Sequence, residues 1–328
     1  MSSKYNHIDS MWLDVVSDLV MRPVIHSRGG DCREIIGWSG TLENTQGSFL
    51  TNPRRALDPA YAAAEFIWYM RRDDDIKMIK EYAPQYEKFA EANGKAFGAY
   101  GKRLDDGTRW DLLWLAEKLL RDDAESRQCV ISIFTPFDLR IVTTAGEAKP
   151  KDIPCTLTWQ FILRDGLLHM VTSMRSNDVW LGFPYDVFVN TCIQRMLANQ
   201  LGWEPGTYTH HVGSMHLYEK HRPALLEALT TFGSGADHDW TQPTTVNDIA
   251  KLIECEEEER QYAQSWGEDC TNTPFHKCSM AADLIHCVRS HKVDCMINPI
   301  HSPALAQGVQ NHVNHRRNRL NRQDDVVS

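Results

Sequence analysis

Apolar residues recur at helical spacing in three stretches of the chain. Between residues 9 and 20 they fall at positions 12, 15, 16 and 19, which predicts an opening helix capped by Asp9 or Ser10. A second helix is predicted over residues 61–70, where Glu65 is the only acid in an apolar segment. A third is predicted over residues 184–202, since it opens on Pro184 and ends at Gly202. A carboxylate inside an apolar helix is unusual, so Glu65 is a candidate functional residue.

Alternating and β-branched stretches predict strands between these helices. Residues 128–134 predict a buried strand, and residues 156–163 and 167–173 flank Asp165-Gly166, which predicts a hairpin. Further along, His216 and Tyr218 alternate with apolar neighbours and share one strand face. Strands and helices intermixed without repeats or a linker predict an α+β domain.

The last quarter of the chain has a different character. Residues 244–328 are predicted to be a helical C-terminal extension of the domain formed by residues 1–243. Here histidines and cysteines crowd together, and zinc has to be considered. The spacing matches no finger or ribbon, so we expect no metal site; the residues are His276, Cys278, His286, Cys287, His291 and Cys295.

Composition narrows the class of protein. The chain has 328 residues, of which 42% are hydrophobic, enough for a sizeable core. A net charge of −9 argues against binding to a nucleic-acid polymer. The nine cysteines are scattered and odd in number, which favours reduced thiols. Since neither a signal peptide nor an apolar run of spanning length stands out, we expect a cytoplasmic protein with no membrane contact.

Three segments carry the candidate chemistry: IPCTLTWQF, MRSNDVWLGFPYDVF and HHVGSMHLYEKH. A lone cysteine such as Cys155 is more often a packed thiol than a nucleophile. Taken together and in this order, the segments resemble thymidylate synthase and its relatives, the pyrimidine nucleotide hydroxymethylases. The resemblance runs from about Asp9 to His221. It implies a thymidylate synthase-like fold, a mixed sheet packed with helices, with the sheet at the interface of a homodimer.

The resemblance implies a covalent mechanism. Cys155 would add to C6 of a pyrimidine nucleotide, so that C5 can attack a one-carbon unit carried by 5,10-methylenetetrahydrofolate. Arg175 is expected to lower the pKa of the thiol. Glu65 matches the general acid/base and should have a raised pKa, while Tyr100 matches a tyrosine implicated in removing the C5 proton.

Other matches imply how the nucleotide is held. The phosphate donors would be Arg28, Arg127, Arg175 and Ser176. Arg127 matches an arginine that comes from the partner subunit, which implies active sites shared across the homodimer. Many family members have a second arginine beside it, where this chain has Gln128. His216 and Tyr218 match the pair that binds the 3′-hydroxyl of the sugar.

The folate cofactor would lie on another set of residues. Asp178 matches the carboxylate that binds the pterin ring, and Leu181, Gly182 and Tyr185 match its platform. Tyr86 aligns with a tryptophan that shields the cofactor in methylating enzymes, and Phe89 with a second aromatic position.

Asp186 bears on the choice of base. Uracil-specific relatives have asparagine at this position, whereas a protonated carboxyl complements N3 and the 4-amino group of cytosine. This predicts a cytidylate substrate, dCMP or CMP, with Ser176 favouring dCMP.

The product depends on whether hydride or water reaches the exocyclic methylene group at C5. A tyrosine in place of tryptophan, and a C-terminus unlike the apolar closing tail of methylating relatives, predict water and therefore hydroxymethylation. Four alternatives remain: a dCMP or CMP 5-methyltransferase, a thymidylate synthase acting on dUMP, an inactive regulatory homologue, and a zinc-stabilised interaction module.

Overall fold

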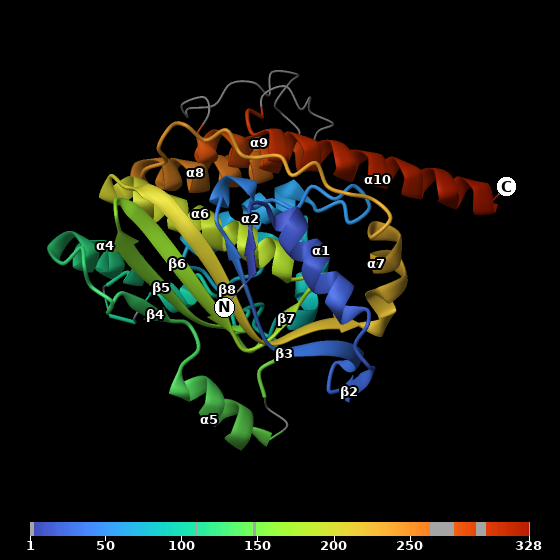
Figure 1. Ribbon diagram of the computed structural model, residues 1–328, viewed down its shortest axis with the longest axis horizontal. Coiled ribbons are helices and arrows are strands. Elements are labelled where there is room, and N and C mark those ends of the chain that lie inside the picture. Colours follow the sequence, from blue (N-terminus) through green and yellow to red (C-terminus); the bar gives the residue numbers. More distant parts are fainter. Residues whose placement is uncertain are drawn as a thin grey trace.

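The computed structural model describes residues 3–105, 107–108, 110–146, 149–262, 279–292 and 300–327. It has the α+β architecture predicted, with one mixed sheet packed against helices (Figure 1). Across the described ranges, none of the helices has both the length and the apolar character of a membrane span.

Eight strands form the sheet, with the main order β1-β3-β8-β6-β5-β4. The short strand β2 pairs with β3, and β7 pairs with β8. The pairs β3–β8 and β5–β6 are antiparallel, whereas β6–β8 is parallel. The strands are β1 (Ser3–Tyr5), β2 (Ile25–Ser27), β3 (Gly30–Leu42), β4 (Val130–Ser132), β5 (Thr156–Arg164), β6 (Leu167–Met174), β7 (Asn177–Asp178) and β8 (Glu204–Tyr218).

The hairpin prediction is confirmed. Strands β5 and β6 are joined by Asp165 and Gly166, whose φ angles are 51° and 79°. Two consecutive positive φ angles suit the right-handed twist of the flanking strands, and an Asp-Gly pair adopts them at little cost.

The run at residues 128–134 is not a buried strand, contrary to the sequence prediction. Only Val130–Ser132 pair with β5, at the end of the sheet order, and Val130 is 47% exposed. An edge strand packs one side against the core, so only Ile131 of the three is buried.

The chain also forms helices, several of which cover one face of the sheet (Figure 1). They are α1 (Ile8–Leu19), α2 (Pro59–Met70), α3 (Ile79–Tyr82), α4 (Leu112–Asp122), α5 (Pro136–Thr144), α6 (Phe183–Leu201), α7 (Arg222–Ala228), α8 (Val246–Tyr262), α9 (Met280–Lys292) and α10 (Pro303–Val327). Short 3-10 turns are η1 (Thr45–Gly47), η2 (Pro84–Phe89), η3 (Lys102–Leu104) and η5 (Glu219–His221). Gly202, with φ 74°, ends α6 as predicted.

The cap predicted for α1 is wrong. Its N-cap is His7, and Asp9 instead accepts hydrogen bonds from the backbone N–H and the hydroxyl of Thr51. A carboxylate can satisfy a distant loop as well as its own helix, and the sequence alone does not distinguish the two.

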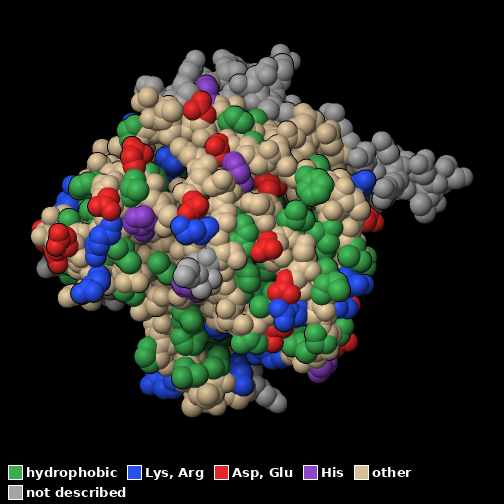
Figure 2. Space-filling view, in the orientation of Figure 1, with side chains coloured by type: hydrophobic (Ala, Val, Ile, Leu, Met, Phe, Trp, Pro, Cys, Tyr) green, Lys and Arg blue, Asp and Glu red, His purple; other side chains and the backbone are tan. Residues whose placement is uncertain are grey.

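The two faces of the sheet differ. On the face toward α6, the side chains of Trp159, Phe161, Met170 and Tyr208 have no exposed area. On the opposite face, Gln160, Val171 and Thr209 are only partly buried. Near this open face, α5 projects from the body with Phe137 49% and Leu139 58% exposed; Figure 2 shows hydrophobic side chains gathered in this lower region.

The C-terminal extension packs onto α2. Helices α8, α9 and α10 run across the top of the molecule in Figure 1, and α9 and α10 both contact α2. Consequently α2 is buried along nearly its whole length. Asp283 of α9 fastens the extension, since its carboxyl accepts hydrogen bonds from Trp240 Nε1 at 2.9 Å and from the backbone N–H groups of His301 and Ser302.

The structure describes only three of the six residues considered as zinc ligands. His286, Cys287 and His291 lie on α9, whereas His276, Cys278 and Cys295 fall outside the described residues. Among the residues described, no group of three or more His, Cys, Asp and Glu side chains is arranged to hold a metal ion.

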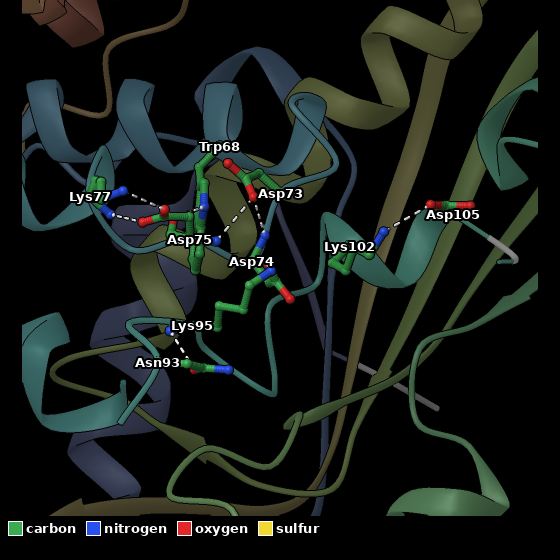
Figure 3. A network of polar contacts seen from close by, with 9 residues as sticks. All are labelled: Trp68, Asp73, Asp74, Asp75, Lys77, Asn93, Lys95, Lys102 and Asp105. Atoms are coloured by element: carbon green, nitrogen blue, oxygen red, sulfur yellow. Dashed lines mark hydrogen bonds and ion pairs between the residues drawn. The ribbon is translucent and has the colours of Figure 1, made fainter. Parts of the chain in front are cut away.

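Polar contacts fix the loop that follows α2 (Figure 3). Trp68 Nε1 donates to the carbonyl of Asp75 at 3.1 Å, and Lys95 Nζ pairs with Asp74 at 2.5 Å. Asp75 and Lys95 also form an isolated β-bridge. These contacts tie the two ends of the segment that contains η2, and therefore position Tyr86 and Phe89 beside α2.

Candidate active site

Cys155 stands immediately before β5, on backbone that its neighbours hold from two sides. Its N–H donates to the hydroxyl of Tyr100 at 3.1 Å, and its carbonyl accepts from the backbone N–H of Arg175 at 2.8 Å. The guanidinium of Arg175 donates to the carbonyls of Pro154 and Ile153 at 3.0 and 2.9 Å. The residue is half-buried, so the thiol is positioned firmly but is not sealed in the core.

The expected activation of this thiol is only partly present. Burial raises the pKa of Cys155 to about 11, and the positive charge of Arg175 opposes this shift without overcoming it. The carboxyl groups of Asp186 and Asp152 add to the rise. In this state of the protein the thiol is therefore mainly protonated at neutral pH.

Glu65 has the raised pKa that its sequence position predicts. Burial raises the pKa to about 7, although hydrogen bonds from Tyr61 and Tyr86 favour the charged form. Both hydroxyls donate to the same oxygen, Oε1, at 2.8 and 3.1 Å. Oε2 is therefore left for proton exchange, as a general acid/base near neutrality requires.

Asp186 is the second carboxyl of the site. Burial of its carboxyl and the charge of Glu65 together raise the pKa to about 8, although a hydrogen bond from Asn177 opposes the shift. Asn177 Nδ2 lies 2.7 Å from Asp186 Oδ2. The carboxyl is therefore mainly protonated at neutral pH, as the sequence argument for a cytosine partner requires.

Tyr100 is hydrogen-bonded to the backbone of Cys155 and lies within electrostatic range of Asp186. Its hydroxyl also accepts from the N–H of Thr156 at 3.2 Å. Burial is the largest reason that the pKa of Tyr100 is raised, and the groups of Cys155 and Asp186 add to it. Two backbone donors occupy the oxygen, so its own proton points to another acceptor.

The predicted phosphate and sugar residues fall into two groups. Burial raises the pKa of Tyr218, and the nearby charges that also affect it include those of Asp178, Cys155 and Arg28. His216 packs edge to face against Tyr218 with ring centroids 5.0 Å apart. Tyr218 thus lies near both Cys155 and Arg28, and Ser176 follows Arg175 directly in the chain.

Arg127 lies elsewhere. It is exposed and precedes the edge strand β4, where its carbonyl accepts a hydrogen bond from Gln160 Nε2. The cation beside the Cys155 thiol is Arg175. Arg127 therefore lies at the open face of the sheet, the face on which Gln160 is partly buried.

The residues predicted to bind the folate include Asp178, one of whose carboxylate oxygens has no hydrogen-bond partner in the described residues. Asp178 Oδ1 accepts from the N–H groups of Trp180 and Leu181 at 2.8 and 3.0 Å, whereas its buried Oδ2 has no hydrogen-bond partner in the described part of the chain. An orphaned buried carboxylate oxygen fits the N–H donors of a pterin ring. Leu181 beside it is 47% exposed and offers an apolar surface.

The platform continues through aromatic rings. Tyr185 packs edge to face on Tyr61 with centroids 4.6 Å apart, and Tyr61 contacts Tyr86. Tyr86 in turn contacts Phe89, which is 43% exposed. These rings lead from the Asp178 side of the site to Glu65.

Three residues of the site were missed by the sequence reasoning. Tyr61 precedes Glu65 by four residues on a predicted helix, so the shared face was a usable signal. His210 has the same strand parity as His216. Asn177 stands inside the MRSND motif but had no assigned role.

Fold and site together define an α+β protein with a half-buried cysteine near carboxyl groups of raised pKa. The model for thymidylate synthase matches residues 21–236, and the chain belongs to that family. It is 26% identical over 186 residues to a thymidylate synthase of Bacillus phage phi3T, and equally to one of Bacillus subtilis subsp. natto. In each case the match covers 55% of this chain and 64% of the relative, so the chain spans less than two thirds of those proteins.

A solved structure agrees on the fold. The thermostable thymidylate synthase A from Bacillus subtilis superposes with a TM-score of 0.56 at 21% identity, covering 69% of this chain and 86% of that one. Helices α8 to α10 lie beyond the matched residues 21–236.

Proposed function

We propose that the protein transfers a one-carbon unit to C5 of a cytidylate nucleotide, converting dCMP to 5-hydroxymethyl-dCMP. The observation that carries the proposal is Asp186, an aspartic acid with a pKa of about 8 in the site of Cys155. A protonated carboxyl donates to N3 of cytosine and accepts from the 4-amino group. Uracil has a donor at N3 and an acceptor at position 4, so it would need the carboxyl proton on the other oxygen.

The chain's own residues account for the proton transfers. Cys155 Sγ bonds to C6 while Asp186 holds the base, and the thiol proton passes to Glu65, whose pKa of about 7 lets it take and return protons. Tyr100 then takes part in removing the C5 proton. Expulsion of Cys155 restores the C5–C6 double bond and closes the cycle.

5,10-Methylenetetrahydrofolate, when bound, supplies the carbon at the oxidation level of formaldehyde. Asp178 Oδ2 would hold its pterin ring, with Leu181, Gly182 and Tyr185 as the platform and Phe89 at its exposed side. The proposal needs neither metal nor nicotinamide.

Water addition is favoured over reduction by the contact between Tyr86 and Glu65. The hydroxyl of Tyr86 donates to Glu65 Oε1 at 3.1 Å, so the ring that aligns with a shielding tryptophan carries a polar group into the site. Once Glu65 has passed the thiol proton to the amine that leaves, it can accept a proton from a water held there as that water adds to the exocyclic methylene. The product would be a hydroxymethyl group together with tetrahydrofolate.

The proposal includes a two-fold homodimer joined through the open face of the sheet. The partly exposed side chains of that face, the projecting helix α5 and exposed Arg127 support it. Phosphate would then be bound by Arg28, Arg175 and Ser176 of one subunit and by Arg127 of the other.

The test is incubation with methylenetetrahydrofolate and dCMP, CMP or dUMP in turn, followed by mass analysis of the nucleotide. We expect dCMP to gain one hydroxymethyl group without formation of dihydrofolate. A methyl group on dCMP would make the protein a cytidylate methyltransferase. Preferred turnover of dUMP to thymidylate, the activity that the named relatives suggest, would overturn the proposal.

A further inference from the structure

Four buried polar side chains lead through the interior to Asp186. Asn190 Nδ2 donates to the hydroxyl of Tyr208 at 3.0 Å, and that hydroxyl lies 2.7 Å from His210 Nδ1. His210 Nε2 lies 3.0 Å from Asn177 Oδ1, and Asn177 Nδ2 lies 2.7 Å from Asp186 Oδ2. We call these four residues the Asp186 relay: Asn190, Tyr208, His210 and Asn177.

The Asp186 relay is part of the rigid core. Tyr208 and His210 have no exposed area, and Asn190 and Asn177 are 3% and 5% exposed. It starts and ends on α6, because Asn190 follows Asp186 by four residues, and it crosses β8 and β7 between. A chain of buried hydrogen bonds holds each member in one orientation.

Each hydrogen bond of the relay is donated in the direction from Asn190 toward Asp186. Tyr208 accepts from Asn190 and has one proton, which goes to His210 Nδ1. Burial lowers the pKa of His210 to about 3, so its ring is neutral and its remaining N–H, on Nε2, donates to Asn177. The Asn177 amide can then present only its NH2 group to Asp186.

This fixes the protonation pattern of Asp186. Oδ2 accepts from Asn177, so the proton of the carboxylic acid belongs on Oδ1. Among the described residues, none of the titratable groups that face the carboxyl is a permanent cation; they are Glu65, Tyr69, Tyr100, Cys155 and Tyr208, with His210 beyond Asn177.

Gly182 provides an independent sign that this contact is built closely. A Cβ at Gly182 would stand 3.0 Å from Asn177 Nδ2 and 3.2 Å from Asp186 Oδ2, tighter than side-chain contacts normally are. Glycine here keeps space for the hydrogen bond between Asn177 and Asp186.

We propose that the Asp186 relay determines base specificity by fixing which oxygen of Asp186 carries the proton. With Oδ2 held by Asn177, Oδ1–H is the donor available to the base. The relay residues are positioning residues: Tyr208, His210 and Asn190 act through Asn177. The inference rests on the proposed use of Asp186 to bind cytosine.

The test compares Asn177→Leu and Tyr208→Phe with Thr191→Val. Thr191 is buried on α6 next to Asn190, but its hydroxyl bonds only to the carbonyls of Val187 and Phe188 of its own helix. Tyr208→Phe keeps the ring and removes the proton that sets the His210 tautomer. For each variant kcat/KM is measured with dCMP and dUMP, and the carboxyl of Asp186 is titrated by infrared difference spectroscopy against Asp186→Asn.

We expect Asn177→Leu and Tyr208→Phe to reduce discrimination between dCMP and dUMP by about tenfold, the effect of one lost or misdirected hydrogen bond. Since the bond from Asn177 lowers the pKa of Asp186, the infrared titration should move to higher pH in Asn177→Leu. Thr191→Val should change neither quantity.

Two different results separate this inference from the proposed function. In Asn177→Leu, the Asp186 titration could stay unchanged while kcat/KM falls equally with dCMP and dUMP. That result would show that the relay has only a structural role, and it would overturn the inference. A shifted titration in an enzyme that prefers dUMP would instead retain the relay's control of the proton and overturn the cytidylate assignment.

Discussion

The carboxyl groups of Glu65 and Asp186 influence each other across the site. After burial, the charge of Glu65 is the next largest reason that the pKa of Asp186 rises to about 8, while that of Glu65 is about 7. Two close carboxyls resist being ionised together. At neutral pH the pair therefore holds at most one full negative charge, with the proton mainly on Asp186.

The pH profile should report this pair. Asp186 must be protonated to donate to cytosine, so kcat/KM for dCMP should fall as pH rises through about 8. Because the folded-state pKa is raised above the ordinary value, the protonated form is the one favoured below pH 8. Steady-state rates between pH 6 and 10, roughly the range that brackets both groups, are the measurement. Activity that stays flat through this alkaline range would contradict the role of Asp186.

Asp186→Asn should move preference from dCMP toward dUMP. An amide donates and accepts at fixed atoms and complements uracil, so we expect the dCMP to dUMP ratio of kcat/KM to fall by at least ~100-fold. The alkaline limb near pH 8 should disappear as well. Asp152→Asn is the matched control, since Asp152 also faces Cys155 but has no predicted contact with the base.

Shared sites can be tested by mixing two inactive variants. Cys155→Ser should lose at least ~1000-fold in turnover while keeping nucleotide affinity, because it removes only the bond to C6. Arg127→Ala should lose phosphate affinity. After dissociation and reassociation, the mixture should recover about a quarter of the wild-type sites if Arg127 acts across the interface. Absence of any recovery would show that Arg127 serves its own subunit or none.

Tyr86→Trp should increase methylated product at the expense of hydroxymethylated product. The larger ring excludes water and removes the hydroxyl that donates to Glu65. Tyr61→Phe is the control, because it removes the other hydrogen bond to the same Glu65 oxygen without changing the ring beside the cofactor position. Chromatography of both nucleotide products, with dihydrofolate absorbance, distinguishes the outcomes.

The C-terminal extension should unfold with the catalytic domain. Asp283→Ala leaves Trp240 and two buried N–H groups without their acceptor, so we expect a loss of about 2–4 kcal/mol in the free energy of unfolding. Calorimetry should show one transition at lower temperature. Asp122→Ala, which removes an exposed carboxyl paired only with Lys118, should leave it nearly unchanged. A separate early transition in Asp283→Ala would mark residues 244–328 as an independent unit.

The sequence predictions were most accurate where the structure depends on residues close together in the chain. Asp165-Gly166, Gly202 and the apolar setting of Glu65 each act through neighbours along the chain, and the structure confirms all three. The exposed edge strand and the role of Asp9 depend on what packs from elsewhere, which no local pattern encodes. The same holds for the thiol pKa, since Arg175 was identified but the extent of burial around Cys155 was not.

Helix α2 lies inside the segment that matches the family model, whereas the C-terminal helices that pack on it lie outside that segment. Helix α2 presents Glu65 to the substrate side, and α9 and α10 contact the same helix. Helices α9 and α10, which lie outside the family-matched segment, thus help to bury the helix that carries Glu65. We therefore expect sequence change in α9 and α10 to act on the position of α2, leaving every proposed catalytic side chain as it is.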